Sequence, residues 1–189
     1  MKEESEGNGL FILGNHIHLR LLQEEDAFDL LILSEENRTY WSIYEPSMSD
    51  DYYTLEAQVH RLRHARYAYQ QGKEYHFGIF KRETDRLIGQ ISLYDVKRLP
   101  FMKASLGYSL SEKETKKGYM TEAITLICRY GYRKLRLRRI EAYVSPKNRG
   151  SMRVLEKNGF QREGLMRDYL YIHNEWEDHY LYSLLATDV

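Results

Sequence analysis

The chain has 189 residues, of which 42% are hydrophobic and 30% are charged, so it is long enough for one domain with a buried core. Its 28 basic and 28 acidic side chains cancel, which argues against broad electrostatic binding to nucleic acid or to an anionic membrane. The single cysteine, Cys128, excludes an internal disulfide, and the apolar run over residues 10–13 is too short for a signal peptide or a membrane span. We therefore expect a cytoplasmic protein that contacts neither nucleic acid nor membrane.

The first third of the chain is expected to be mainly helical. Residues 1–14 are expected to form a flexible lead, and residues 15–189 a single domain. The alternating pattern over 16–21 predicts a strand, followed by a helix that starts near residue 23 and fades near Asn37. An irregular loop is expected over 39–51, and a second helix, capped by Ser49 or Asp50, should end at Gly72.

The rest of the chain mixes strands with helices. Period-two patterns predict strands over 75–80, 87–94 and 104–110. A helix over 118–134, a strand over 139–145, a short helix ending at Asn158–Gly159 and a hairpin over 160–185 should follow. This order predicts an α/β (α+β) fold with a mixed, mostly antiparallel central sheet flanked by helices.

The segment from Gly107 to Ala123 combines a strand, a charged turn and a helix that starts at Gly118. The first N–H groups of a helix have no partner within it, and the helix dipole adds partial positive charge there. Gly118 lets a ligand approach the backbone, and Lys116 and Lys117 add positive charge. The segment therefore predicts a site for an anion such as a pyrophosphate.

Other kinds of site are not supported by the sequence. His60 and His64 have helical spacing, but no neighbouring carboxylate or cysteine completes a ligand set, so we expect no metal site. The chain also lacks the Gly-x-Ser-x-Gly motif of serine hydrolases and the Gly-x-Gly-x-x-Gly motif of dinucleotide-binding folds.

A second segment, Asn148 to Phe160, follows the break at Pro146 and reads NRGSMRVLEKNGF. Together with the anion-binding turn and the order of elements, it resembles the GNAT superfamily of acetyl-CoA-dependent N-acetyltransferases. The resemblance covers roughly residues 15–185. The Asn-x-x-Ser helix start and the Glu-Lys-x-Gly-Phe ending are most similar to the branch that acetylates the N-termini of ribosomal proteins.

This resemblance implies that acetyl-CoA is the co-substrate and that its binding residues lie in three groups. The pantetheine arm would pair with the strand at Tyr108, Ser109 and Leu110, Asn148 would hydrogen-bond the arm, and Ser151 would lie near the thiol. The pyrophosphate would bind at Thr115, Lys116, Lys117, Gly118, Tyr119, Met120 and Thr121. Thr115 and Met120 depart from the family's usual Gln or Arg and Gly or Ala, and Met120 is expected to narrow the room for phosphate.

The resemblance also implies that an amine attacks the thioester directly, which requires a neutral amine, an oxyanion donor and a proton for the thiolate. The catalytic candidates are Ser151, Asn148 and Tyr108, and the N–H near Leu110 is a candidate oxyanion donor. Related enzymes often carry a glutamate as base at the positions of Ser105 and Leu170. Because neither is a carboxylate here, the remaining candidates for the base are Glu141, Asp168 and a water molecule.

The acceptor implied by the resemblance is a primary amine, first of all the N-terminal amine of a protein such as a ribosomal protein. A small amine (a polyamine, amino acid or aminoglycoside) is the alternative, and a cofactor-binding module with weak catalysis is another. The acceptor is expected to enter between the first helices, the 39–51 loop and the terminal hairpin. Its walls would be Trp41, Tyr44, Tyr169 and Trp176. The protein is expected to be a monomer or a homodimer.

Overall fold

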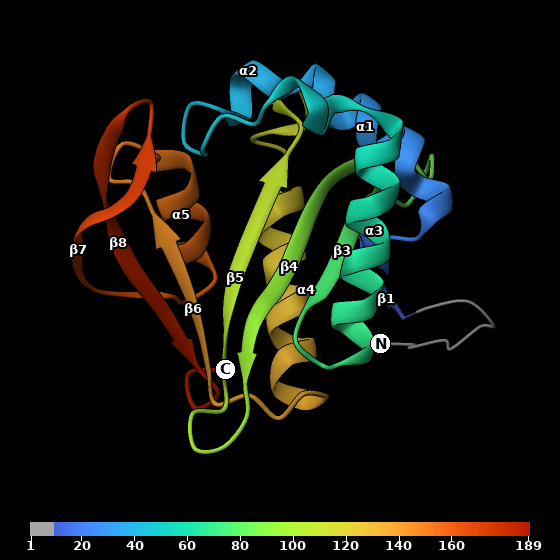
Figure 1. Ribbon diagram of the computed structural model, residues 1–189. Helices are drawn as coiled ribbons and strands as arrows, with labels where there is room; N and C mark the ends of the chain where they lie inside the picture. The colour runs from blue at the N-terminus through green and yellow to red at the C-terminus, as the bar shows by residue number, and fades with distance from the viewer. Residues whose placement is uncertain (1–9) are drawn as a thin grey trace.

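The computed structural model describes residues 10–189, which form one eight-stranded sheet with helices on both faces (Figure 1). The strand order is β1-β2-β3-β4-β5-β6-β8-β7, and all neighbours are antiparallel except β5 and β6. The strands are β1 (Phe11–Leu13), β2 (Ile17–Leu21), β3 (Tyr75–Lys81), β4 (Leu87–Lys97), β5 (Lys103–Leu110), β6 (Arg139–Val144), β7 (Gln161–Ile172) and β8 (Glu175–Leu185). The helices are α1 (Ala27–Glu36), α2 (Arg38–Trp41), α3 (Leu55–Gln70), α4 (Tyr119–Arg133) and α5 (Arg149–Lys157), with short 3-10 turns at Glu24–Asp26, Asp50–Tyr53 and Glu112–Glu114.

This architecture confirms the expected α/β fold with a mixed, mostly antiparallel sheet. Two local predictions are wrong. The flexible lead was placed too far along the chain, because Phe11–Leu13 pairs with β2 and the Ile12 side chain is buried; residues 1–9 lie outside the described residues. Helix α3 is capped by Thr54, whose hydroxyl accepts from the N–H of Ala57, whereas of the predicted caps Ser49 precedes and Asp50 begins a separate 3-10 turn.

The two faces of the sheet carry different kinds of side chain, because successive residues of a strand point to opposite faces. On the face covered by α4, Phe77, Ile91 and Leu93 pack with Ile124 and Ile127 in the main core. On the opposite face, beneath α1 and α3, β4 presents Gln90, Ser92 and Tyr94 instead. The second face is therefore polar near the middle of the sheet, where a polar ligand can be accommodated.

The sheet opens between β5 and β6. These strands pair in parallel only at Lys103–Arg139, Ala104–Ile140 and Ser105–Glu141. Beyond this point β5 stays with β4 up to Leu110, whereas β6 pairs with β8 along its whole length. Figure 1 shows the two strands diverging above their short contact. The inner edges of both strands are thus left without a neighbouring strand over the upper half of the sheet.

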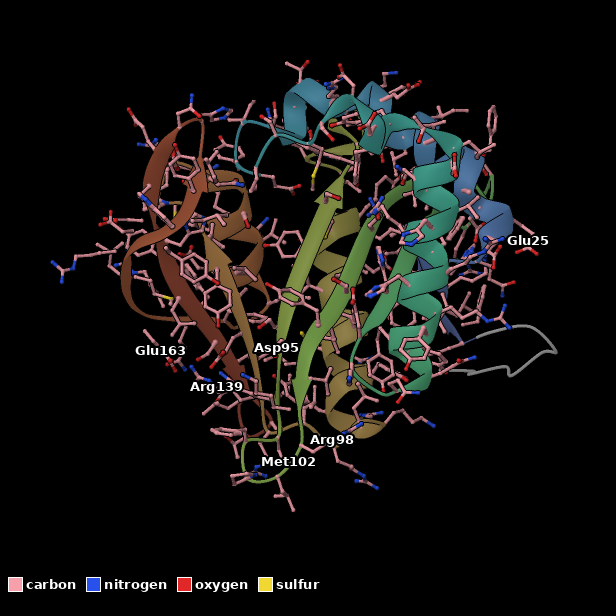
Figure 2. The ribbon with its side chains drawn as sticks, in the orientation of Figure 1. Glu25, Asp95, Arg98, Met102, Arg139 and Glu163 are labelled. Carbon is pink, nitrogen blue, oxygen red and sulfur yellow. The ribbon has the colours of Figure 1, made fainter. Side chains whose placement is uncertain are left out.

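An ionic network joins the strands just below this opening. Glu141 accepts hydrogen bonds from Lys103 (2.8 Å), Arg139 (2.6 Å) and the Tyr143 hydroxyl (3.0 Å). Arg139 also binds both carboxylate oxygens of Glu163 on β7, one of which accepts from Ser183 on β8. Figure 2 shows Arg139 and Glu163 at the lower end of the sheet. The network therefore links β5, β6, β7 and β8 at the base of the opening.

We expect the network to make folding stability depend on pH in the acidic range. The hydrogen bonds from Arg139 and Ser183 lower the pKa of Glu163 to about 2, below the usual value of about 4.3 for an unfolded chain. A carboxyl group with a lowered pKa stabilises the fold above its unfolded pKa, and this contribution is lost as the pH falls toward 2. Because Glu163 is partly exposed, solvent screening reduces the contribution to about 1 kcal/mol.

Glu163→Gln should therefore be less stable than the wild type by about 1 kcal/mol at pH 7, and the difference should vanish near pH 2. Urea unfolding of both proteins between pH 2 and pH 7 measures this difference in the free energy of unfolding. Glu83→Gln, at an exposed position in the β3–β4 turn, is the matched control and should show no such trend. A constant difference at every pH would contradict the assignment to the Glu163 charge.

Candidate functional site

A cavity of about 290 Å³ lies where β5 and β6 separate. Its floor is formed by the diverging strands, and its upper walls come from the loop after α2, the start of α5 and the β7–β8 hairpin. The lining residues are Tyr44, Glu45, Tyr94, Leu106, Gly107, Tyr108, Ala142, Tyr143, Val144, Ser145, Asn148, Ser151, Tyr169, Leu170 and His179. The cavity thus brings together segments that are more than one hundred residues apart in the sequence.

The open edge of β5 offers backbone groups to the cavity. The N–H of Ser111 donates to Ile88 of the neighbouring β4 at 2.8 Å. Because alternate residues of an antiparallel strand bond to the same neighbour, Ser109 also bonds toward β4, whereas Tyr108 and Leu110 point their backbone groups toward the opening. The carbonyl of Leu110 is occupied by the indole N–H of Trp41 at 2.9 Å. The Tyr108 N–H and carbonyl and the Leu110 N–H are therefore the groups that an extended ligand would meet.

The turn after β5 ends in the geometry of an anion site. Gly118 caps α4 with a left-handed backbone (φ 89°), and a Cβ at this position would have no protein atom within 4 Å. Lys116 is also left-handed, with φ 62°. The first N–H groups of α4, a helix of 15 residues, therefore face an open space in front of the turn.

The side chains of this turn differ from what the sequence suggested. Lys117 is paired with the buried Glu114 at 2.9 Å, so much of its charge is neutralised locally. Met120 was expected to narrow the room for phosphate, and this is wrong, because its side chain packs in the main core and is 7% exposed. Only the backbone of Met120 faces the turn, and a large side chain at this position leaves the anion site open.

A hydroxyl pair lies between β5 and α5. The Tyr108 hydroxyl and Ser151 Oγ are 2.6 Å apart. Asn148 caps α5 by accepting the Ser151 N–H at 3.0 Å, so it fixes the helix turn that carries Ser151. Burial raises the pKa of the Tyr108 hydroxyl, and the hydrogen bond to Ser151 offsets this only in part. The phenol is therefore protonated at neutral pH and can supply a proton through Ser151.

The predicted aromatic walls are divided between the cavity and other places. Tyr44 and Tyr169 line the cavity, and the Tyr169 ring stacks on Tyr143 with centroids 4.9 Å apart. Trp41 does not line the cavity; its indole fixes the 42–45 loop to the end of β5. Trp176 is exposed on the β7–β8 hairpin against Tyr171 and is not among the residues that line the cavity, so its contact with the acceptor stays a prediction.

The two carboxylates considered as bases are not in the cavity either. Burial opposes ionisation of Glu141, but the hydrogen bonds from Lys103, Arg139 and Tyr143 together hold its pKa below the ordinary value. Asp168 is exposed on β7 and lies outside the cavity lining. Glu141 and Asp168 therefore lie among the strands, outside the cavity, and are not placed for proton transfer there.

Glu45 was missed by sequence reasoning, although it is the one carboxylate among the cavity-lining side chains of the described chain. It follows Tyr44 in a loop with no periodic pattern, so neither face nor partner could be assigned from the sequence. The Glu45 side chain stays exposed, and its partial loss of hydration beside the cavity raises its pKa to about 7, with Arg61 acting in the opposite direction. His179, from β8, is a second missed lining residue, and it is buried against the Tyr169 ring.

Two other kinds of site were also sought over residues 10–189. No group of three or more metal-ligating side chains lies close enough together to hold an ion. No helix there has the length and apolar character needed to cross a membrane.

Comparison with known proteins agrees with this geometry. Residues 16–161 match the family model described as "Acetyltransferase (GNAT) domain". The chain is 43% identical over 175 residues to the Bacillus subtilis protein named "Probable N-acetyltransferase YjcK", covering 93% of this chain and 97% of that protein. It is 34% identical over 170 residues to "[Ribosomal protein uS5]-alanine N-acetyltransferase" of Escherichia coli, covering 90% of this chain and 88% of that protein.

A solved structure extends the similarity to the whole fold. The ribosomal-protein-S5-alanine acetyltransferase of Vibrio fischeri superposes with a TM-score of 0.89 at 30% identity, covering 94% of this chain and 97% of that chain. The resemblance inferred from the two sequence segments is thereby confirmed at the level of the family. The chain belongs to the GNAT acetyltransferase family, and it is an N-acetyltransferase that takes its acetyl group from acetyl-CoA.

Proposed function

We propose that this protein transfers the acetyl group to the N-terminal amine of a protein, such as a ribosomal protein. The observation that carries the proposal is the cavity in the β5–β6 opening, which has a hydroxyl pair on one side and an aromatic wall on the other. The two relatives named for the uS5 and S5 alanine support a protein terminus as the acceptor. A chain terminus is narrow enough for the cavity of about 290 Å³, while the following residues can lie over the outer loops.

The donor side of the site is formed by β5, α4 and α5. The N–H groups at the start of α4 would hold the pyrophosphate, with Gly118 allowing the close approach. The open edge at Tyr108 and Leu110 would pair with the extended pantetheine arm, as an added strand does. Acetyl-CoA supplies an activated thioester, and the residues of the chain need only orient it and manage protons.

The chemistry follows from the positions of the hydroxyl groups. An amine that attacks the thioester carbon forms a C–N bond, and the C–S bond then breaks to release the thiolate of CoA. Ser151 would give a proton to that sulfur, and the protonated Tyr108 phenol, 2.6 Å away, would restore it. The N–H of Leu110 would donate to the developing oxyanion.

The experiment that tests this function measures transfer from labelled acetyl-CoA into a panel of acceptors. The panel contains peptides with free N-termini, including ribosomal-protein N-termini, the same peptides with blocked N-termini, polyamines, amino acids and aminoglycosides. We expect label in the free peptides and none in the blocked ones. Preferential labelling of a polyamine, amino acid or aminoglycoside would replace the proposed acceptor, and thiol release without any labelled product would contradict efficient transfer.

Gly118→Ala should weaken the binding of acetyl-CoA about 10-fold or more, because an added methyl group would stand in the space where phosphate approaches the N–H groups. This corresponds to losing one charge-assisted hydrogen bond of about 1.5 kcal/mol. Calorimetric titration of acetyl-CoA measures the effect. Gly164→Ala is the control for an added methyl group, because a Cβ at Gly164 would also have no protein atom within 4 Å. Gly164 does not have a left-handed backbone. Unchanged affinity in Gly118→Ala would mean that the phosphate binds elsewhere.

Ser151→Ala should lower kcat by about 100-fold and leave the affinity for acetyl-CoA nearly unchanged. Steady-state kinetics with thiol detection measures the first quantity, and calorimetry the second. Tyr108→Phe keeps the Ser151 hydroxyl and removes its partner, so its kcat should fall less than that of Ser151→Ala. Equal turnover in Ser151→Ala and the wild type would remove Ser151 from the mechanism.

A further inference from the structure

Glu45 lies in a loop that is held at both walls of the cavity. The N–H groups of Tyr44 and Glu45 donate to the carbonyl of Trp41 at 3.2 Å, and Trp41 in turn binds the end of β5 through its indole. On the other side, a ring nitrogen of His173 in the β7–β8 hairpin lies 2.7 Å from the carbonyl of Ser42. The loop therefore bridges the opening, and Glu45 is placed over the cavity by contacts with both of its walls.

The Glu45 carboxylate has no partner in the described chain. It forms no ion pair and no side-chain hydrogen bond with residues 10–189, unlike Glu141, Glu163 and Glu177, which are each held by cationic groups. Arg61 of α3 and Tyr52 of the preceding 3-10 turn act on it electrostatically, and His179 and the tyrosines of the cavity are the other titratable groups that line the same space. A carboxylate that lines a cavity without a partner favours a cationic ligand.

The strand register places Tyr108 and Gly107 on different faces of β5. Tyr108 lies opposite Ile91, so its side chain points to the α4 face, where it meets Ser151 of α5. Gly107 lies opposite Ser92, on the polar face, and it lines the cavity together with Tyr94. A Cβ at Gly107 would lie 3.2 Å from the Tyr94 ring, so the glycine lets this ring pack against the strand. The Tyr108–Ser151 hydroxyl pair therefore lies on the α4 face of β5, while Gly107 and Tyr94 belong to the polar face.

We propose that Glu45 binds the ammonium group of the acceptor and accepts its proton before attack. This proposal rests on the acetyl transfer proposed above. One proton passes from the ammonium to Glu45 and then to water. The second proton leaves the nitrogen to water as the amide forms, and a proton from water returns to Tyr108, which replaces the one that the thiolate receives through Ser151.

The acid–base properties of Glu45 fit an α-amine better than a lysine or polyamine amine. The pKa of Glu45 is raised to about 7, and an α-ammonium has a pKa of about 7.7–8.0, so the proton transfer is nearly balanced. A lysine ammonium has a pKa of about 10.4, which makes the same transfer unfavourable by about three pK units. A base with a pKa close to that of its substrate is the efficient arrangement.

The test compares the wild type with Glu45→Gln, which keeps the shape of the side chain and removes its charge and basicity. For a peptide with a free N-terminus, we expect kcat/KM at pH 7 to fall by about 100-fold. The acidic limb of the pH profile should also move up from near 7 to the pKa of the peptide amine. Affinity for acetyl-CoA, measured by calorimetry, should not change. Glu83→Gln, far from the cavity on the β3–β4 turn, is the matched control and should behave as the wild type.

A second acceptor separates a role in proton transfer from a structural role. An alkoxyamine at the end of a short peptide is already neutral at pH 7, so Glu45→Gln should acetylate it at nearly the wild-type rate. An equal loss with both acceptors would assign Glu45 a structural role, and an unchanged pH profile would remove it from catalysis; either result overturns the proposal. If the wild type acetylates no member of the panel, the proposed function fails as well, whereas an active wild type matched by Glu45→Gln overturns the Glu45 assignment alone.

Discussion

The site depends on the short parallel contact between β5 and β6. Each of these strands has a full-length antiparallel neighbour on its outer side, β4 for β5 and β8 for β6, so the sheet is held together while its inner edges separate. Unpaired backbone N–H and C=O groups at such an edge require a partner, which water or a ligand must provide. The network around Glu141 and Arg139 reinforces this short contact, because Lys103 of β5 binds Glu141, the last residue of β6 that pairs with β5. The position of the cavity is therefore set by ordinary strand pairing and by a few charged side chains beneath it.

The pleat of β5 then separates the two halves of the reaction. Residues that alternate along one strand face opposite sides of the sheet, so Tyr108 meets α5 while Gly107 faces the space beneath the loop after α2. The leaving sulfur needs a proton and the entering nitrogen must lose one, and these tasks conflict if the same groups serve both. In the proposed mechanism, the Tyr108–Ser151 pair would serve the sulfur and Glu45, in the loop after α2, would serve the nitrogen, so the two tasks fall to different elements.

The parts of the fold that the sequence predicted are those with a local signal. Period-two patterns predicted the strands, and the glycine before an apolar run predicted the start of a helix at Gly118, which the structure confirms. The resemblance of the Asn148–Phe160 segment then placed Ser151 next to the site. What could not be predicted depends on distant contacts: Trp41 is an anchor because it reaches Leu110, and Trp176 is exposed because its hairpin turns that face outward. Met120 and Glu45 illustrate the same limit, since the direction of one side chain and the hydration of the other are set by packing that no local pattern records.

The chain as a whole is neutral, but opposite charges lie at the two ends of the site. At the donor end, the N–H groups of α4 and the side chain of Lys116 favour an anion, whereas the acceptor end presents Glu45 and no cationic side chain among the described residues that line the cavity. Under the proposed function, this arrangement would orient the two substrates, because an anionic donor is disfavoured near Glu45 and a cationic acceptor is disfavoured near Lys116. The overall charge balance of the chain carries no information about such local fields.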